Sequence, residues 1–240
     1  MTLALGPAVG TAQTPSASAP AAKSAAMPEL IQEFFLSEAV RSEDRGELQA
    51  TAGAESFRNL GSDVNLSFEY GLTDRLQVST ELPYGITATQ QAMVPLSWST
   101  VGVGALYQFS RSSKPLTFSA GVEAEVPVNS RGEWEWEPEF LAAKMFGPTQ
   151  LHVSFIAGLG QGPREYAYNA ATVTDLHGKW FPTFEFSGRN NEFGNQFYIT
   201  PGIYRRFPHR LEAGAAVATG SHLGMLFKLT WEHGGDEDNN

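Results

Sequence analysis

Apolar residues occupy every second position along most of the chain, in runs that end at clusters of Gly, Pro, Asn and Asp. A period of two is typical of β-strands with one apolar and one polar face, and the intervening clusters are typical of turns. Twelve such runs follow one another, which predicts an antiparallel meander. They cover residues 46–55, 63–71, 75–82, 100–109, 116–128, 134–144, 151–159, 165–173, 179–187, 196–204, 210–218 and 223–232. The alternation is weakest in 165–173, without which the strand number would be odd.

The two faces of these runs differ in chemistry, because successive side chains of a strand point to opposite sides. The apolar face carries Phe68, Val78, Val122 and Phe227, whereas the opposite face carries Glu69, Ser79 and Glu123. A soluble ligand-binding barrel needs the reverse arrangement, with a polar exterior around an apolar interior. A soluble β-sandwich also alternates, with its apolar face turned into a core, and it stays as the alternative.

The length of the runs favours a membrane protein over a sandwich. Tilted transmembrane strands have about 9–11 residues, whereas soluble strands average about 5–6. Aromatic residues at the ends of the runs would form the girdles of a membrane barrel: Tyr70, Tyr107, Phe109, Trp134, Trp136, Trp180, Tyr204 and Trp231. We therefore expect an all-β fold, a transmembrane antiparallel up-and-down β-barrel of about 12 strands.

The connections between the runs fall into two alternating sets. Those at 72–74, 110–115, 145–150, 174–177 and 205–209 are tight and basic, and we assign them to the periplasmic end. Those at 56–62, 83–99, 129–133, 161–164, 188–195 and 219–222 include the longest, 83–99, and we assign them to the outside. An even number of strands then returns both termini to the periplasm.

The residues before the barrel have a different composition. Residues 1–12 resemble the end of a signal peptide without its basic region, and the Ala-, Ser- and Pro-rich stretch that follows is too poor in large apolar groups to fold. We expect a signal remnant and disordered leader over 1–28, and a periplasmic or plug segment over 29–45. An amphipathic helix over 29–43 is predicted within that segment. The barrel would span 46–232, followed by an acidic tail over 233–240.

The order of short motifs adds a family resemblance. YGLTDRLQVSTELPYG, VGVGALYQF, VEAEVPVNSRGEWEWEPEFLAAKMFG, FPTFEFSG, ITPGIYRRF and GMLFKLTWE follow one another over residues 46–232. This order resembles the bacterial outer-membrane β-barrel transporter family of the meta-pathway phenol-degradation type. The resemblance implies a barrel in the outer membrane of a Gram-negative-type bacterium. The solutes of such a transporter would be small, with hydrophobic or aromatic compounds among them. It implies no catalytic residues.

Composition excludes several classes of function. Lys and Arg number 16 against 26 Asp and Glu, and a net charge of −10 would repel a nucleic-acid backbone. With no cysteine, the chain has no disulfide, thiolate nucleophile or Cys-ligated zinc. The five histidines lack metal-binding spacing, and the Gly-rich run at 158–162 is followed by Pro163 instead of a helix. We therefore expect no metal and no cofactor.

One pair of residues raises an enzyme hypothesis. His152 and Ser154 lie two positions apart on the predicted luminal face, where a serine could attack an acyl carbonyl while the histidine accepts its proton. No Asp or Asn is clearly placed to orient the imidazole. We therefore keep an outer-membrane hydrolase only as a further alternative, and expect no enzyme.

The predicted luminal face is acidic. Its lining residues are Glu69, Glu81, Glu123, Glu125, Glu135, Glu137, Glu139, Glu185 and Glu212, together with Lys228; Glu47 has the same orientation. Unpaired carboxylates do not stay charged in a dry core, so water, Arg partners or protons must accompany them. We favour a narrow cation-favouring channel or transporter for small solutes, with outer-membrane lipid around it. A plugged scaffold barrel is the alternative, and a homo-oligomer is compatible with either.

Overall fold

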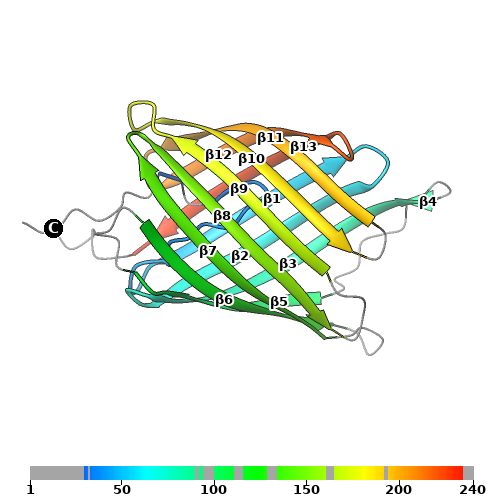
Figure 1. Ribbon diagram of the computed structural model, residues 1–240, viewed down its shortest axis with the longest axis horizontal. Coiled ribbons are helices and arrows are strands. Elements are labelled where there is room, and N and C mark those ends of the chain that lie inside the picture. Colours follow the sequence, from blue (N-terminus) through cyan, green and yellow to red (C-terminus); the bar gives the residue numbers. More distant parts are fainter. Residues whose placement is uncertain are drawn as a thin grey trace, which may run out of the picture.

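The computed structural model describes residues 30–31, 33–89, 92–93, 100–110, 116–128, 134–160, 165–191 and 194–234. The predicted leader over 1–28 and residues 235–240 of the predicted tail lie outside this part of the chain. Within it, twelve antiparallel strands form a closed barrel (Figure 1). They are β1 Leu48–Phe57, β2 Gly61–Thr73, β3 Leu76–Thr89, β5 Thr100–Gln108, β6 Leu116–Pro127, β7 Glu135–Phe146, β8 Thr149–Gly160, β9 Glu165–Thr174, β10 Trp180–Asn191, β11 Gly194–Phe207, β12 Leu211–Gly220 and β13 Gly224–His233.

The barrel closes between its first and last strands. Each strand pairs with the next one along the chain, and β1 pairs with β13 from Leu48 opposite His233 to Phe57 opposite Gly224. A two-residue strand, β4 (Ala92–Met93), pairs only with the far end of β3 and takes no part in the ring. The expected up-and-down topology is confirmed, and the run 165–173 is β9.

Several connections expected outside the barrel are partly strand, most of all 83–99 and 188–195. β3 continues through 83–89, and β10 and β11 meet at Asn191 and Gly194, so the expected loops 83–99 and 188–195 are too long. The error has a physical cause. Beyond the lipid, neither face of a hairpin has to be apolar, so the backbone ladder continues where the alternation that reveals a strand has stopped.

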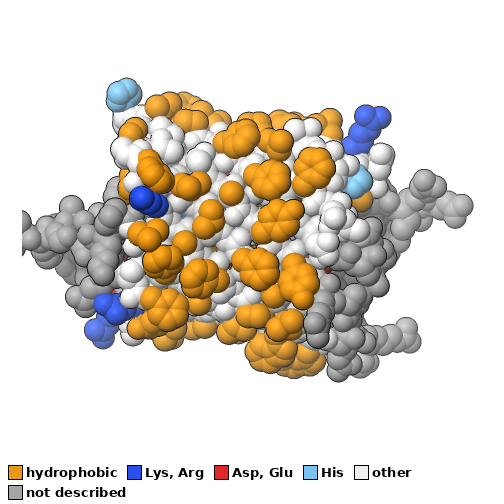
Figure 2. Space-filling view, in the orientation of Figure 1, with side chains coloured by type: hydrophobic (Ala, Val, Ile, Leu, Met, Phe, Trp, Pro, Cys, Tyr) orange, Lys and Arg blue, Asp and Glu red, His pale blue; other side chains and the backbone are white. Residues whose placement is uncertain are grey.

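Large apolar side chains cover the outside of the barrel. In Figure 2 they spread over the visible face between the two ends, where Lys and Arg gather. Phe68, Val122 and Phe227 are exposed by 40%, 40% and 51%, as expected for the outer face. A β-sandwich would have buried these side chains between two sheets, so that alternative is wrong. An apolar belt around a closed barrel fits a lipid surface.

The segment before β1 lies inside the barrel and is not helical. We name residues 30–31 and 33–45 the luminal segment; they form bends and a turn, so the helix expected over 29–43 is wrong within the described residues. The amides of Phe35 and Leu36 donate hydrogen bonds to Glu185 of the wall instead of to carbonyls of their own segment. Because the wall satisfies its backbone, the segment needs no helix. The part of the chain that the structure describes contains no helix able to cross a membrane.

The larger of two hydrophobic clusters that the described residues form inside the barrel lies on one side of it. The smaller one packs Val40 against Leu106 of β5 and Leu141 and Ala143 of β7. In the larger cluster, buried side chains of the luminal segment, Leu30, Ile31, Phe34 and Phe35, pack against inward-facing residues of β9 to β13. These wall residues are Ala171, Val173, Phe181, Tyr204, Ala216, Ala218 and Leu226. We name this surface the apolar half-wall.

The face assignment of β6 is tested by moving a charge across it. Val122→Arg places a cation on the outer face and should lower the free energy of unfolding in lipid by about 2–4 kcal/mol. The matched control, Glu123→Arg, puts the same side chain on the inner face, where the cost should be much smaller. Refolding into vesicles, followed by gels of boiled and unboiled samples, measures the folded fraction. Equal losses in both variants would contradict the assignment.

Candidate functional site in the barrel lumen

Two phenylalanine side chains of the luminal segment pack against aromatic rings of the inner wall of the barrel. The Phe34 ring meets His152 edge-on, with ring centroids 4.5 Å apart, and the Phe35 ring stacks on Tyr204 at the same distance. Gly202 leaves room for Phe35, since a Cβ built there would lie 2.5 Å from Cε2 of that ring. Small wall residues thus create the space that the aromatic side chains fill.

A buried carboxylate anchors the same part of the segment. Glu185 of β10 has no exposed surface, and its two carboxylate oxygens accept hydrogen bonds from the amides of Phe35 and Leu36, each at 2.8 Å. Two donors on one carboxylate offset part of the cost of burying its charge. The anchor also removes two backbone donors that would otherwise lack partners inside the barrel.

An ion pair forms the second anchor. Nζ of Lys228 on β13 lies 2.6 Å from a carboxylate oxygen of Glu33, whose other oxygen accepts a hydrogen bond from Nε2 of Gln49 at 3.2 Å. Burial alone would raise the pKa of Glu33, but the charge and hydrogen bond of Lys228 lower it overall. The positive charge of Lys228 is therefore largely taken up by the luminal segment.

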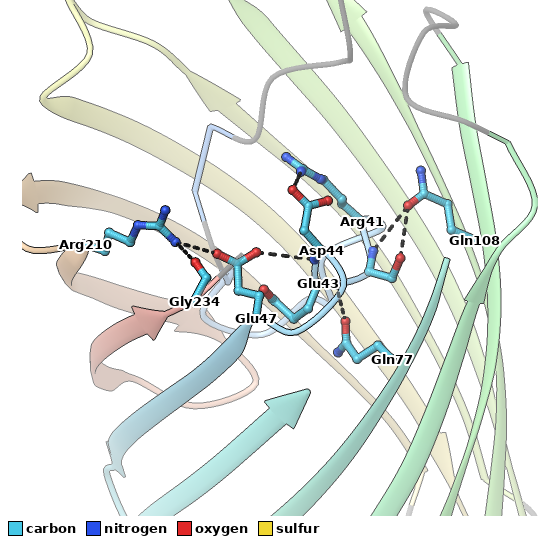
Figure 3. A network of polar contacts seen from close by, with 9 residues as sticks. Arg41, Glu43, Asp44, Glu47, Gln77, Gln108, Arg210 and Gly234 are labelled. Atoms are coloured by element: carbon cyan, nitrogen blue, oxygen red, sulfur yellow. Dashed lines mark hydrogen bonds and ion pairs between the residues drawn. The ribbon is translucent and has the colours of Figure 1, made fainter. Parts of the chain in front are cut away.

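The last residues of the segment are tied to β3 and β5 by amide side chains (Figure 3). The backbone amide and the hydroxyl of Ser42 contact Oε1 of Gln108 at 3.4 and 3.2 Å, and the amide of Glu43 donates to Oε1 of Gln77 at 2.9 Å. Both glutamines are buried. These contacts hold the segment against the wall until it enters β1.

A charged cluster surrounds the point where the segment joins β1 (Figure 3). Arg210 pairs with Glu47 at 2.9 Å and donates to the carbonyl of Gly234. Carboxylate oxygens of Glu43, Glu47 and Glu232 lie within 4.8 Å of one another, a spacing that could hold a metal ion. Arg210 already supplies a positive charge to Glu47. By itself, the cluster therefore indicates a structural contact that joins the start of β1 to the end of β13.

The rest of the lumen holds an acidic cavity of about 220 Å³. Its lining includes five wall carboxylates, Glu69 of β2, Glu81 of β3, Glu123 of β6, and Glu137 and Glu139 of β7. Lys228 and the segment residue Glu38 also line it. A second cavity of about 290 Å³ shares Asn65, Glu81, Phe35 and Lys228 with the first and reaches Glu55 and Asp63. We name the two together the acidic vestibule.

The other carboxylates expected to line the lumen lie outside the vestibule. Glu125 and Glu135 face each other across β6 and β7 and are part of neither cavity. Glu185 is covered by the luminal segment, and Glu212, 1% exposed, pairs with Arg206 at 3.4 Å. Six of the ten expected residues therefore lie together around the vestibule, namely Glu69, Glu81, Glu123, Glu137, Glu139 and Lys228.

The sequence did not reveal the apolar half-wall, because its residues form no distinctive pattern along the chain. Tyr204 was expected in an aromatic girdle, but it is 1% exposed and faces inward, so that assignment is wrong. A signal was present, because Tyr204 has the parity of Thr200 and Gly202, whereas Ile203 lies on the outer face. Rigorous use of the alternation would have placed the tyrosine inside.

His152 and Ser154 do not form a nucleophile and base. Neither nitrogen of His152 has a hydrogen-bond partner within the described residues, and the ring packs on Phe34. An asparagine does lie close, which the sequence did not reveal, but Nδ2 of Asn169 donates to the serine oxygen at 3.0 Å. A base must reach the proton it removes, and this arrangement lacks that contact.

Comparison with known proteins identifies the fold. No family model and no curated protein matches the chain. Among solved structures, the KdgM porin is 8% identical, covering 76% of this chain and 98% of that chain with a TM-score of 0.61. The COG4313 outer membrane channel from Pseudomonas putida F1 is 9% identical, covering 81% and 98% with a TM-score of 0.64. The chain thus has the fold of an outer-membrane β-barrel, and its apolar belt fits that location.

The close packing of Phe35 against Gly202 predicts the effect of one added methyl group. Gly202→Ala should displace the ring and weaken docking of the luminal segment by about 1–3 kcal/mol, as overpacking does. Tryptic cleavage after Arg41 and Arg45 in the folded barrel should then be at least about fivefold faster than in the parent chain. Gly104→Ala, which faces the vestibule and meets only the rotatable hydroxyl of Ser79 closely, is the control. An unchanged cleavage rate in Gly202→Ala would contradict the packing of Phe35 against this glycine.

Proposed function

We propose that the chain forms a narrow channel or transporter for small solutes in the outer membrane, and that its acidic vestibule favours cations. The observation that carries the proposal is the charge lining the open part of the lumen. Five wall carboxylates from β2, β3, β6 and β7 line it, while the positive charge of Lys228 is paired with Glu33. A charged ring in a narrow path selects solutes by sign.

The arrangement of the carboxylates supports this selectivity. Glu123 and Glu137 lie directly opposite each other on β6 and β7, and like charges so placed repel. At about 4 Å two such charges interact by about 1 kcal/mol in bulk water, and by about 4 kcal/mol at the effective dielectric constant near a protein surface. A cation between them would relieve this repulsion, whereas an anion would add to it.

The same charges limit the class of solute. A structure of the KdgM porin contains disordered oligogalacturonate, which is a polyanion. The vestibule would repel such a ligand, so we do not extend that ligand to this chain. Small cationic and neutral solutes fit the lining better. The sequence resemblance to the phenol-degradation type adds small hydrophobic or aromatic compounds, and the side chain of Phe35, which lines both cavities of the vestibule, is compatible with them.

A plugged scaffold is the second candidate function. The anchors at Glu185 and Lys228 favour it, because they hold the luminal segment across part of the lumen. The two candidates differ in ion flow. A scaffold would give no conductance in a planar bilayer, whereas a channel would.

Reversal potentials in a salt gradient test the proposed selectivity. The parent chain should prefer cations at neutral pH and low salt, and the double variant Glu123→Gln/Glu137→Gln should lose much of that preference because it removes two charges from the vestibule. The matched control is Glu125→Gln/Glu135→Gln, which removes two charges on the same strands outside both cavities. An anion preference, or equal effects of the two double variants, would refute the selectivity by these residues.

A further inference from the structure

The tip of the luminal segment carries a carboxylate that faces the vestibule. Glu38 lies between the anchors of Phe35 and Ser42, and its side chain is exposed to the luminal space. Within the described part of the chain it makes no hydrogen bond or ion pair. Glu33 differs, because it pairs with Lys228, and Arg41 differs, because it pairs with Asp44 at 2.9 Å.

The charges around Glu38 come from five of the strands that border the cavity, β2, β3, β6, β7 and β13. The wall contributes Glu69 of β2, Glu81 of β3, Glu123 of β6, Glu137 and Glu139 of β7, and Lys228 of β13. The segment itself contributes Glu33, Arg41 and Glu43. Since Lys228 and Arg41 are already paired, the balance of charge facing Glu38 is negative.

We propose that the luminal segment is a proton-controlled plug, whose tip, residues 37–40, stays docked while Glu38 is protonated and withdraws from the wall when Glu38 is ionised. The ionised form meets the wall carboxylates across the vestibule, and like charges this close in a confined space destabilise the docked arrangement. The anchors at Glu185 and Lys228 retain the segment up to Leu36, and the bonds of Ser42 and Glu43 to β5 and β3 retain its end, so the movement is confined to the tip. On withdrawal, Val40 leaves the apolar cluster that it forms with side chains of β5 and β7.

The direction of the pH dependence follows from linkage. Glu38 faces the enclosed space of the lumen and not bulk water, and this loss of solvation together with the neighbouring carboxylates raises its pKa from the ordinary value of 4.5 to about 7 in the docked arrangement. The docked state therefore binds more protons than the withdrawn state between these two values. Docking is strongest below about pH 4.5, weakens as the pH rises towards 7, and changes little above that.

A buried wall residue reports the movement. The hydroxyl of Ser119 on β6 donates to the carbonyl of Val40, and Ser119 has no exposed surface while the tip is docked. Because the chain has no cysteine, Ser119→Cys creates a single thiol covered by the tip. Ser79→Cys, which lines the vestibule, is the matched control for the effect of pH on thiol reactivity.

The experiment measures how fast neutral 2-hydroxyethyl methanethiosulfonate modifies each thiol in the refolded full chain. The rate at position 119 divided by the rate at position 79 should rise about tenfold from pH 5 to pH 8. With Glu38→Gln added, the ratio should stay constant within about twofold, since the amide does not titrate. A constant ratio without Glu38→Gln, or an equal rise with it, would overturn the proposal. The inference rests on the luminal path proposed above only for its effect on transport, because labelling needs no conductance.

Discussion

A carboxylate buried inside a barrel wall must find hydrogen-bond donors, and this requirement at Glu185 organises the interior of the protein. Its partners are the amides of Phe35 and Leu36, which come from a segment about 150 residues earlier in the chain. These two hydrogen bonds satisfy both partners, since the carboxylate gains two donors and the two backbone amides of the segment gain acceptors. Removing either partner would leave a buried polar group unsatisfied, which costs about 1–3 kcal/mol or more.

The division of the lumen follows from this attachment. The segment that Glu185 holds places its phenylalanines on the apolar half-wall, where glycines and alanines give them room. The opposite half-wall, from β2 to β7, turns five carboxylates towards open space, those of Glu69, Glu81, Glu123, Glu137 and Glu139. One barrel thus contains a packed core and an acidic vestibule side by side, and the tip of the luminal segment forms the boundary between them.

The sequence predicted the barrel well because lipid imposes a strict pattern. Each membrane-spanning strand must turn alternate apolar residues outward, so Phe68, Val122 and Phe227 could be placed without a structure. The same alternation placed Glu69, Glu123 and Glu137 inside. It could not separate carboxylates around open space from those with partners, because the partners of Glu185 and Lys228 are far away in the sequence.

The luminal segment was harder to predict for a related reason. Its apolar spacing at Leu30, Phe34 and Val40 is compatible with a helix, but the wall supplies the hydrogen bonds that a helix would make within itself. Tertiary contacts decided its conformation, and propensity had little influence. The ends of β3 and β10, which extend past the membrane, were also not predicted from the alternation, because outside the lipid no face has to be apolar.

Amide hydrogen exchange of the refolded full chain tests the central arrangement most directly. If the luminal segment is bound to the wall through Glu185, the amides of Phe35 and Leu36 should exchange slowly, with protection comparable to that of amides in neighbouring strands. Glu185→Gln keeps the shape but offers one carbonyl oxygen in place of two carboxylate oxygens, so protection at one of these amides should fall. Exchange of both amides at the rate of an unfolded peptide in the parent barrel would contradict the account.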